Sequence, residues 1–348
     1  MKIIQSSNNI INLYNDENIF DWYSKFSNNR IIRDRFGLDL NKYSPWHISD
    51  KVDILPDGNV SISIETALHE EISSICKLKK NVYIMWSGGV DSTAIICSFI
   101  QNGYSKTNIH ILYTEDSIKE YPQFFNYLQK NSFNMILFDY SSLFELIKNV
   151  IQSDDILING VHGDKLYEGL FPESYENIHW KQFVLENSGK QYIPIFEHIL
   201  KSFDFNPTTT ADFFWMMDFN FRWGETLTLP FVKNVILPFS SDTFQNICVN
   251  RMKTFHSYGV KESSNPSLYK PELKKIIFDV TKDTDYTNSK QKIRSFKNIK
   301  GFNKTSYKYN IYLWCESGVI VETAINSYEK MKFLKYWRKD QYNNIDWI

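Results

Sequence analysis

The chain has 348 residues, 43% of them hydrophobic, and is therefore long enough to bury the core of one large or two modest domains. Its formal net charge is only −1, its start does not resemble a signal peptide, and no apolar run approaches the length of a membrane span. The four cysteines lie too far apart in sequence to suggest a zinc knuckle or a disulfide framework. These features predict a soluble, cytoplasmic protein without a membrane partner.

The chain is expected to begin with an α+β segment at residues 1–80, followed by a larger domain at residues 81–348. The sequence indicates no role for the first segment. Short strands are expected at 52–55 and 59–64, because these two runs flank a Pro-Asp-Gly turn. A helix is expected from Glu65 to Leu78, where apolar residues recur on one face.

The most informative segment follows, at residues 82–93. Val82 to Trp86 is a short apolar run typical of a buried parallel strand, and two glycines follow where the backbone must turn sharply. Hydroxyl groups and the first N–H groups of the next helix would complete a phosphate cradle, although an ordinary strand–turn–helix is the alternative. Asp91 would repel phosphate without an intervening cation, and it therefore predicts bound Mg²⁺. The candidate nucleotide-binding residues of this segment, the glycine loop (87–93), are Ser87, Gly88, Gly89, Val90, Asp91, Ser92 and Thr93.

Strands and helices alternate after the glycine loop. The expected strands are 109–113, 135–138 and 156–159, and the expected helices lie near 121–130 and at 142–151. This alternation predicts an α/β fold with a doubly wound parallel sheet, whose ligands bind at the carboxyl ends of the strands. Tyr113 ends one of these strands and is a further candidate for nucleotide binding. From residue 172 onward the pattern becomes mostly helical and aromatic, and aromatic residues at helical spacing predict a packed core.

A second glycine-rich segment, the second loop (159–169), follows the last of these strands. Gly160 and Gly163 would let the backbone come close to a ligand. Asp164 supplies a second carboxylate near the place where a metal bound to Asp91 would need one, because two carboxylates from separate strand ends can share Mg²⁺. The alternative is a surface turn with a capping aspartate.

The motif Ser-Gly-Gly-Val-Asp-Ser-Thr resembles the pyrophosphate-loop (PP-loop) signature of the ATP pyrophosphatase superfamily, whose members cleave ATP between the α- and β-phosphates. The second loop resembles the Gly-x-Gly-x-Asp-x-x-x-x-Gly loop of the asparagine synthetase branch, which includes β-lactam synthetases. The resemblance covers roughly residues 80–300. It implies an adenine nucleotide alpha hydrolase-like fold, pyrophosphate binding at the glycine loop and a magnesium-ligand role for Asp164.

Two lysine-containing segments extend this resemblance. Residues 270–274 and 290–294 are similar to the Lys-x-x-Leu-Arg helix and the Arg-x-Lys loop of the same branch, in which the loop lysine stabilises the charge on departing pyrophosphate. Lys292 matches that lysine by local pattern, while Lys290 fits the spacing from Lys270 slightly better. We expect a mobile loop that closes over ATP, with Lys292 catalytic and Lys290 a solvated neighbour.

The chain departs from this branch in two places. Residues 1–80 are too short for the glutaminase domain of the amidotransferases, and the first cysteine is Cys76, so we expect this chain to make no ammonia. Asparagine synthetases have a Glu two residues after the first glycine of this loop and β-lactam synthetases use a Tyr in this region, and these groups act in the second half-reaction. This chain instead has Val161 and His162 after Gly160. His162 is a candidate base in their place, because the ordinary pKa of imidazole lies near neutral pH, although a loop histidine is as often structural.

These features predict a ligase that uses ATP and Mg²⁺, releases AMP and forms a C–N bond. It would adenylate a small-molecule or peptide carboxylate and join it to an amine, or to ammonia from an amidotransferase partner. An enzyme that modifies tRNA or a nucleobase is an alternative, because residues 251–310 contain 14 Lys and Arg against 5 Asp and Glu. A degenerate nucleotide-binding subunit is another, because the second loop is altered.

Overall fold

The computed structural model divides the chain into two compact units, each formed by segments that are separate in sequence. One unit contains Met1–Leu55, Ser174–Thr228 and Arg294–Ile348, and the other contains Pro56–Glu173 and Leu229–Ile293. The residues that the structure describes are 2–6, 60–138, 146, 149–152, 154–166, 178–187, 190, 193–202, 206–210, 212–216, 235–254, 269–290, 310–314, 320–324 and 346–347.

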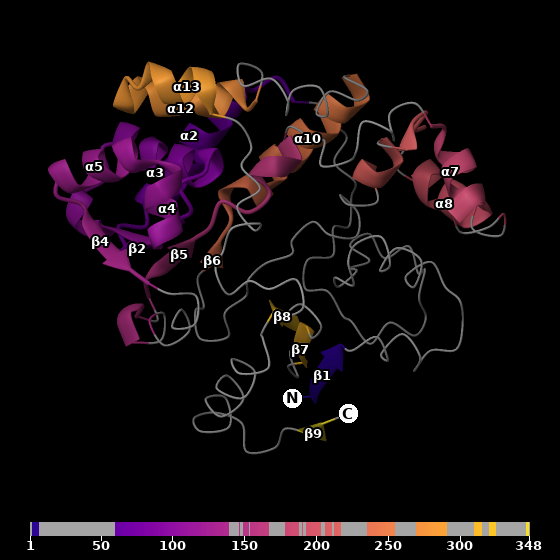
Figure 1. The fold of residues 1–348 in the computed structure, drawn as a ribbon, viewed down its shortest axis with the longest axis horizontal. Helices are drawn as coiled ribbons and strands as arrows, with labels where there is room; N and C mark the ends of the chain where they lie inside the picture. The colour runs from indigo at the N-terminus through magenta and orange to yellow at the C-terminus, as the bar shows by residue number, and fades with distance from the viewer. Residues whose placement is uncertain are drawn as a thin grey trace. The chain divides into compact units, whose positions relative to one another are not determined.

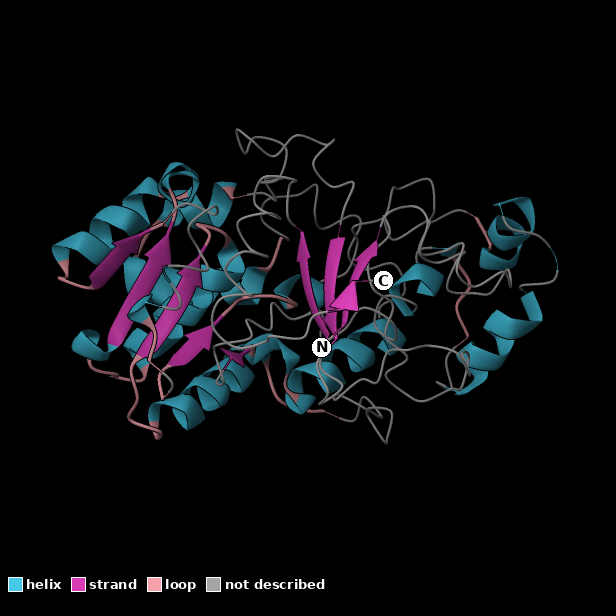
Figure 2. Ribbon diagram, turned by 90° about the horizontal axis from the view of Figure 1, so that it is seen from below, coloured by secondary structure: helices cyan, strands magenta, loops and turns pink. Residues whose placement is uncertain are grey.

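A five-stranded, all-parallel sheet forms the centre of the unit that contains the glycine loop (Figures 1 and 2). The predicted doubly wound α/β fold is therefore confirmed. In spatial order the strands are β4 (Asn134–Leu137), β3 (Ile109–Tyr113), β2 (Val82–Trp86), β5 (Ile156–Ile158) and β6 (Val235–Ile236).

Helices alternate with these strands along the chain and pack against the sheet. They are α2 (Ile64–Cys76), α3 (Val90–Gln101), α4 (Glu115–Glu120), α5 (Pro122–Lys130), α10 (Asp242–Thr254), α12 (Pro271–Thr281) and α13 (Thr284–Ser289). The central helix is α3, which packs against β2 and against both α2 and α12. Residues 92–99 of α3 are all buried, as expected for a helix with neighbours on every side.

The order of the strands places the glycine loop and the second loop next to each other. The chain moves from β2 outward through β3 to β4, and then returns to the other side of β2 with β5 and β6. Ligands of such sheets bind where this direction changes, outside the carboxyl ends of the strands. Here that position lies between β2 and β5, which are directly followed by the glycine loop and the second loop.

Several expected elements differ in detail. Residues 60–63 form no strand, because Ser63 instead caps α2: its hydroxyl oxygen accepts a hydrogen bond from the Thr66 N–H. The expected strand at 52–55 lies outside the described residues, as does most of the expected helix at 142–151. The sequence analysis missed α4, which begins with a capping box between Thr114 and Ser117.

The other unit contains a four-stranded sheet in the order β8 (Ile320–Ala324), β7 (Asn310–Trp314), β1 (Lys2–Ser6), β9 (Asp346–Trp347). The sequence pattern did not predict β7 or β8. The same unit contains α7 (Trp180–Asn187) and α8 (Ile193–Ser202). Its aromatic residues pack as a core, as predicted: Phe213 stacks on Trp180 and meets Phe196 edge to face. Among the described helices, none combines the length and apolar character that crossing a membrane requires.

Candidate functional site

Hydroxyl groups brace the glycine loop from within. The Ser92 Oγ accepts a hydrogen bond from the Ser87 N–H at 3.1 Å, and the Gly89 N–H donates to the Ser87 Oγ at 3.2 Å. The indole N–H of Trp86 donates to the Thr93 Oγ1 at 2.9 Å, and the Thr93 hydroxyl donates to the Gly89 carbonyl at 2.7 Å. These contacts fix the turn at the start of α3, where the first helical N–H groups lack intrahelical acceptors and favour an anion.

Gly88 is required by both its conformation and its surroundings. Its φ of +79° lies in the left-handed region, and a Cβ there would lie 2.5 Å from the Ser117 carbonyl oxygen and 2.8 Å from the Glu120 Cβ. The Ser117 hydroxyl donates to the Trp86 carbonyl at 2.8 Å, which holds α4 against the end of β2. The glycine loop therefore lies directly against α4.

The second loop approaches α3 equally closely. A Cβ on Gly163 would lie 2.4 Å from the Asp91 Cγ, and one on Gly160 would lie 3.1 Å from the Ser92 nitrogen. Neither position has room for a larger residue without movement of its neighbour. The two glycines thus bring Asp91 and Asp164 to one place, although one follows β2 and the other follows β5.

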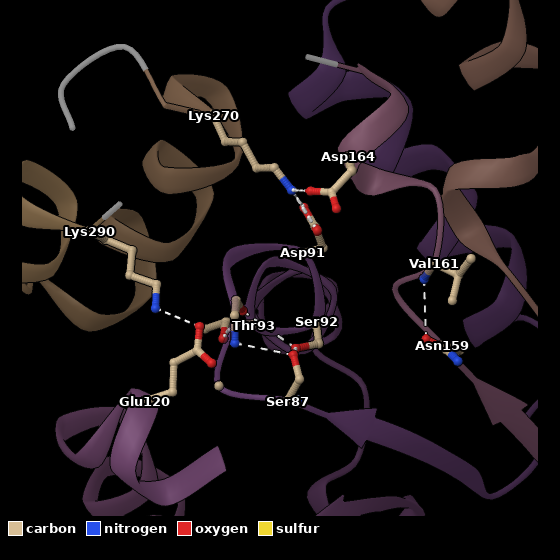
Figure 3. Close-up of polar contacts among 12 residues, drawn as sticks. Ser87, Asp91, Ser92, Thr93, Glu120, Asn159, Val161, Asp164, Lys270 and Lys290 are labelled. Atoms are coloured by element: carbon tan, nitrogen blue, oxygen red, sulfur yellow. Dashed lines mark hydrogen bonds and ion pairs between the residues drawn. The ribbon is translucent and has the colours of Figure 1, made fainter. Parts of the chain in front are cut away.

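Lys270 joins these two carboxylates. Its ammonium lies 2.6 Å from both carboxylate oxygens of Asp91 and 2.6 Å from the Asp164 Oδ1 (Figure 3). The Lys270 side chain is only 2% exposed. Burial by itself would lower the pKa of Lys270, but the charges of Asp164 and Asp91 outweigh that effect and raise it.

The backbone of Lys270 is strained. Its φ of 51° and ψ of 52° are left-handed, although the residue is not glycine and precedes Pro271. Such conformations cost about 1–3 kcal/mol and gather at functional sites. In this conformation, Lys270 lies at the start of α12 and its ammonium points toward the two carboxylates.

A second ion pair lies beside the glycine loop. The Lys290 ammonium is 2.6 Å from the Glu120 Oε1, and the two side chains are 6% and 12% exposed. The Lys290 carbonyl accepts a hydrogen bond from the Lys274 ammonium at 2.7 Å. The expectation that Lys290 is solvated is therefore wrong, because α12 and α4 enclose it.

Two stacked tyrosines connect α13 to the same loop. The rings of Tyr121 and Tyr286 lie 3.6 Å apart at an angle of 9°. The Tyr286 hydroxyl donates to the Gly88 carbonyl at 3.5 Å, and the Tyr121 hydroxyl donates to Asp283 at 3.1 Å. Residues at the start of α13 are thereby held in a fixed position beside the glycine loop.

His162 lies in the second loop with its side chain turned to another element. It is buried, its φ is +75°, and its Nδ1 lies 2.5 Å from the Ser240 Oγ. Ser240 belongs to the 3₁₀ turn η7 (Pro238–Ser240) that follows β6. The contact gives His162 a structural role, because it links the second loop to η7.

The donor set fits magnesium. Mg²⁺ is commonly held by one or two carboxylates, and phosphate and water oxygens complete its shell. Asp91 and Asp164 supply two such carboxylates, while among the described residues no group of three or more metal-binding side chains gathers.

The remaining candidates lie at the same edge of the sheet or outside the described residues. Tyr113 pairs in register with Trp86, and its ring packs against Phe125 at 5.3 Å. Lys292 falls outside the described residues. No sequence pattern predicted a role for Glu120; the one signal in the sequence is its position in the chain, soon after the end of β3.

Comparisons with protein families and with curated proteins found no match to this chain.

Proposed function

We propose that this protein is an ATP-dependent, AMP-forming ligase that adenylates a substrate oxygen and forms a C–N bond. The convergence of Asp91 and Asp164 beside the glycine loop is the observation that carries the proposal. Two carboxylates next to an anion-binding turn are a costly arrangement without cations. Lys270 supplies one positive charge against their two negative charges, and the pair suits a polyphosphate that arrives with Mg²⁺.

The residues around the glycine loop have different roles in this proposal. The N–H groups at the start of α3 bind phosphate oxygens, and the glycine loop holds them in position. Asp91 and Asp164 would hold Mg²⁺, which neutralises negative charge on the triphosphate. Lys270 and Lys290 add positive charge on two sides of the loop (Figure 3), where it favours binding of the negatively charged phosphates.

The proposal assigns cleavage between the α- and β-phosphates because the glycine loop resembles the PP-loop signature of enzymes that cleave ATP there. A carboxylate substrate would attack the α-phosphate, so that pyrophosphate departs and an acyl-adenylate remains. An amine, or ammonia, would then attack the carbonyl carbon and displace AMP.

Isotope exchange between pyrophosphate and ATP tests this function. The purified chain, with Mg²⁺, would be screened against a panel of carboxylates, and exchange is expected only when the right carboxylate is present. Product analysis should then show AMP and pyrophosphate. Release of ADP and orthophosphate would contradict the proposal, as would the absence of any ATP binding.

A further inference from the structure

Glu120 is an acidic side chain that lies directly against the two glycines of the glycine loop. It is the last residue of α4, and a Cβ on Gly89 would lie 3.7 Å from its Oε1. A Cβ on Gly88 would lie 2.8 Å from the Glu120 Cβ. Its carboxylate therefore stands where a bound polyphosphate would experience its charge.

A carboxylate in this position opposes phosphate binding. Like charges a few ångströms apart repel strongly in a partly buried site, because little solvent lies between them. Lys290 balances the charge of Glu120 at 2.6 Å. Through this pair the Lys290 ammonium is itself held on the Glu120 side of the loop, where it could serve a phosphate.

The main chain of Lys290 is held while its side chain makes this pair. Its carbonyl accepts from the Lys274 ammonium, and its N–H donates to the Tyr286 carbonyl at 2.9 Å. Its ammonium lies 5.7 Å from the centre of the Tyr286 ring. A rotation of the side chain alone would therefore move the charge from Glu120 toward a ligand on the loop.

We infer that Glu120 is the resting counter-ion of Lys290 and competes with phosphate for it. This inference rests on the proposed function, since it assigns a use to the same phosphate site. Binding of pyrophosphate, alone or as part of ATP, breaks the Lys290–Glu120 pair and forms a Lys290–phosphate pair. Glu120 thus weakens ground-state binding of polyphosphate, and it is a positioning residue rather than a catalytic one.

Calorimetric titration with magnesium pyrophosphate tests the competition. Glu120→Gln removes the competing charge, so it should tighten pyrophosphate binding about five- to tenfold. Lys290→Met leaves the carboxylate uncompensated and should weaken binding about tenfold or more. The double variant should bind more tightly than Lys290→Met alone. As the matched control, Glu115→Gln removes an exposed charge from the first turn of the same helix and should change the affinity less than twofold.

The two possible failures are distinguishable. If the wild type binds neither pyrophosphate nor ATP, the proposed function is wrong and this inference falls with it. If the wild type binds pyrophosphate and Glu120→Gln binds it equally well or more weakly, only the proposed competition is wrong. Glu120 would then position the Lys290 ammonium for the ligand. Should Glu120→Gln fail to fold, the double variant contains no unpaired charge at the pair and decides the matter: equal or weaker binding than Lys290→Met overturns the inference.

Discussion

Gly88→Ala, compared with Gly103→Ala, measures how closely α4 approaches the glycine loop. Both glycines have positive φ, +79° and +66°, so alanine costs about 1–2 kcal/mol of backbone strain at either position. The surroundings differ. A Cβ on Gly103 meets nothing within 4 Å, whereas one on Gly88 would lie 2.5 Å from the Ser117 carbonyl oxygen.

The difference between the two variants follows from that contact. Ordinary van der Waals contact begins near 3.4 Å, so the loop and Ser117 would have to separate by about 0.9 Å. The bond from Ser117 to the Trp86 carbonyl resists this movement. Forcing an atom into such a space costs about 1–3 kcal/mol. Gly88→Ala should therefore lower the free energy of unfolding by about 2–5 kcal/mol, and Gly103→Ala by about 1–2 kcal/mol.

Thermal unfolding and pyrophosphate titration measure the two consequences. Each kcal/mol lowers Tm by about 2–4 °C in a domain of this size. Gly103→Ala should keep the pyrophosphate affinity of the wild type, while Gly88→Ala should lose about tenfold or more because the N–H groups of the loop move. Equal losses of Tm in the two variants would refute the reasoning, because α4 would then move away from the added Cβ without a loss of stability.

Asp91→Asn should keep its fold but abolish AMP formation, measured by chromatography, because it removes one of the two carboxylates proposed to hold Mg²⁺. Asp154 is exposed at the amino end of β5, so Asp154→Asn should leave AMP formation unchanged. Lys292→Ala should lower kcat about 100- to 1000-fold with little change in KM for ATP, whereas Lys290→Ala should chiefly raise KM. If Lys290→Ala lowers kcat and Lys292→Ala raises KM, Lys290 is the catalytic lysine and Lys292 the binding one. Burial, and then the charge of Lys290, lowers the pKa of Lys274 to about 8 from an ordinary 10.5. Between about pH 8 and pH 10.5 the Lys274 amine therefore binds more protons in the unfolded chain than in the folded chain, so folding becomes more favourable as the pH rises. The Tm of the wild type should rise relative to that of Lys274→Met over this pH range. A difference in Tm that does not change with pH would contradict the lowered pKa.

The local parts of the site could be predicted because they depend on neighbouring residues. An apolar strand, two glycines and a helix start are contiguous, so residue types alone placed the glycine loop between β2 and α3. The meeting of Asp91 and Asp164 also followed from the sheet, since the carboxyl ends of parallel strands share one edge.

The remaining features depend on contacts between distant parts of the chain. Glu120 and Lys290 are 170 positions apart, and no local pattern signals their pairing. The helix that carries Glu120 has six residues, too few for an apolar periodicity to be recognised. Alternating strands and helices do not reveal the lateral order of a sheet, and β6 adds only two residues to it.

The division of the chain into interleaved segments has a practical consequence for protein engineering. Asp91 and Asp164 come from one stretch of the unit that contains the glycine loop, at residues 56–173, while Lys270 and Lys290 come from another, at residues 229–293. No single truncation can isolate this unit with its site complete. A minimal version would require excision of residues 174–228 and a designed bridge across the cut, so that both stretches remain on one polypeptide.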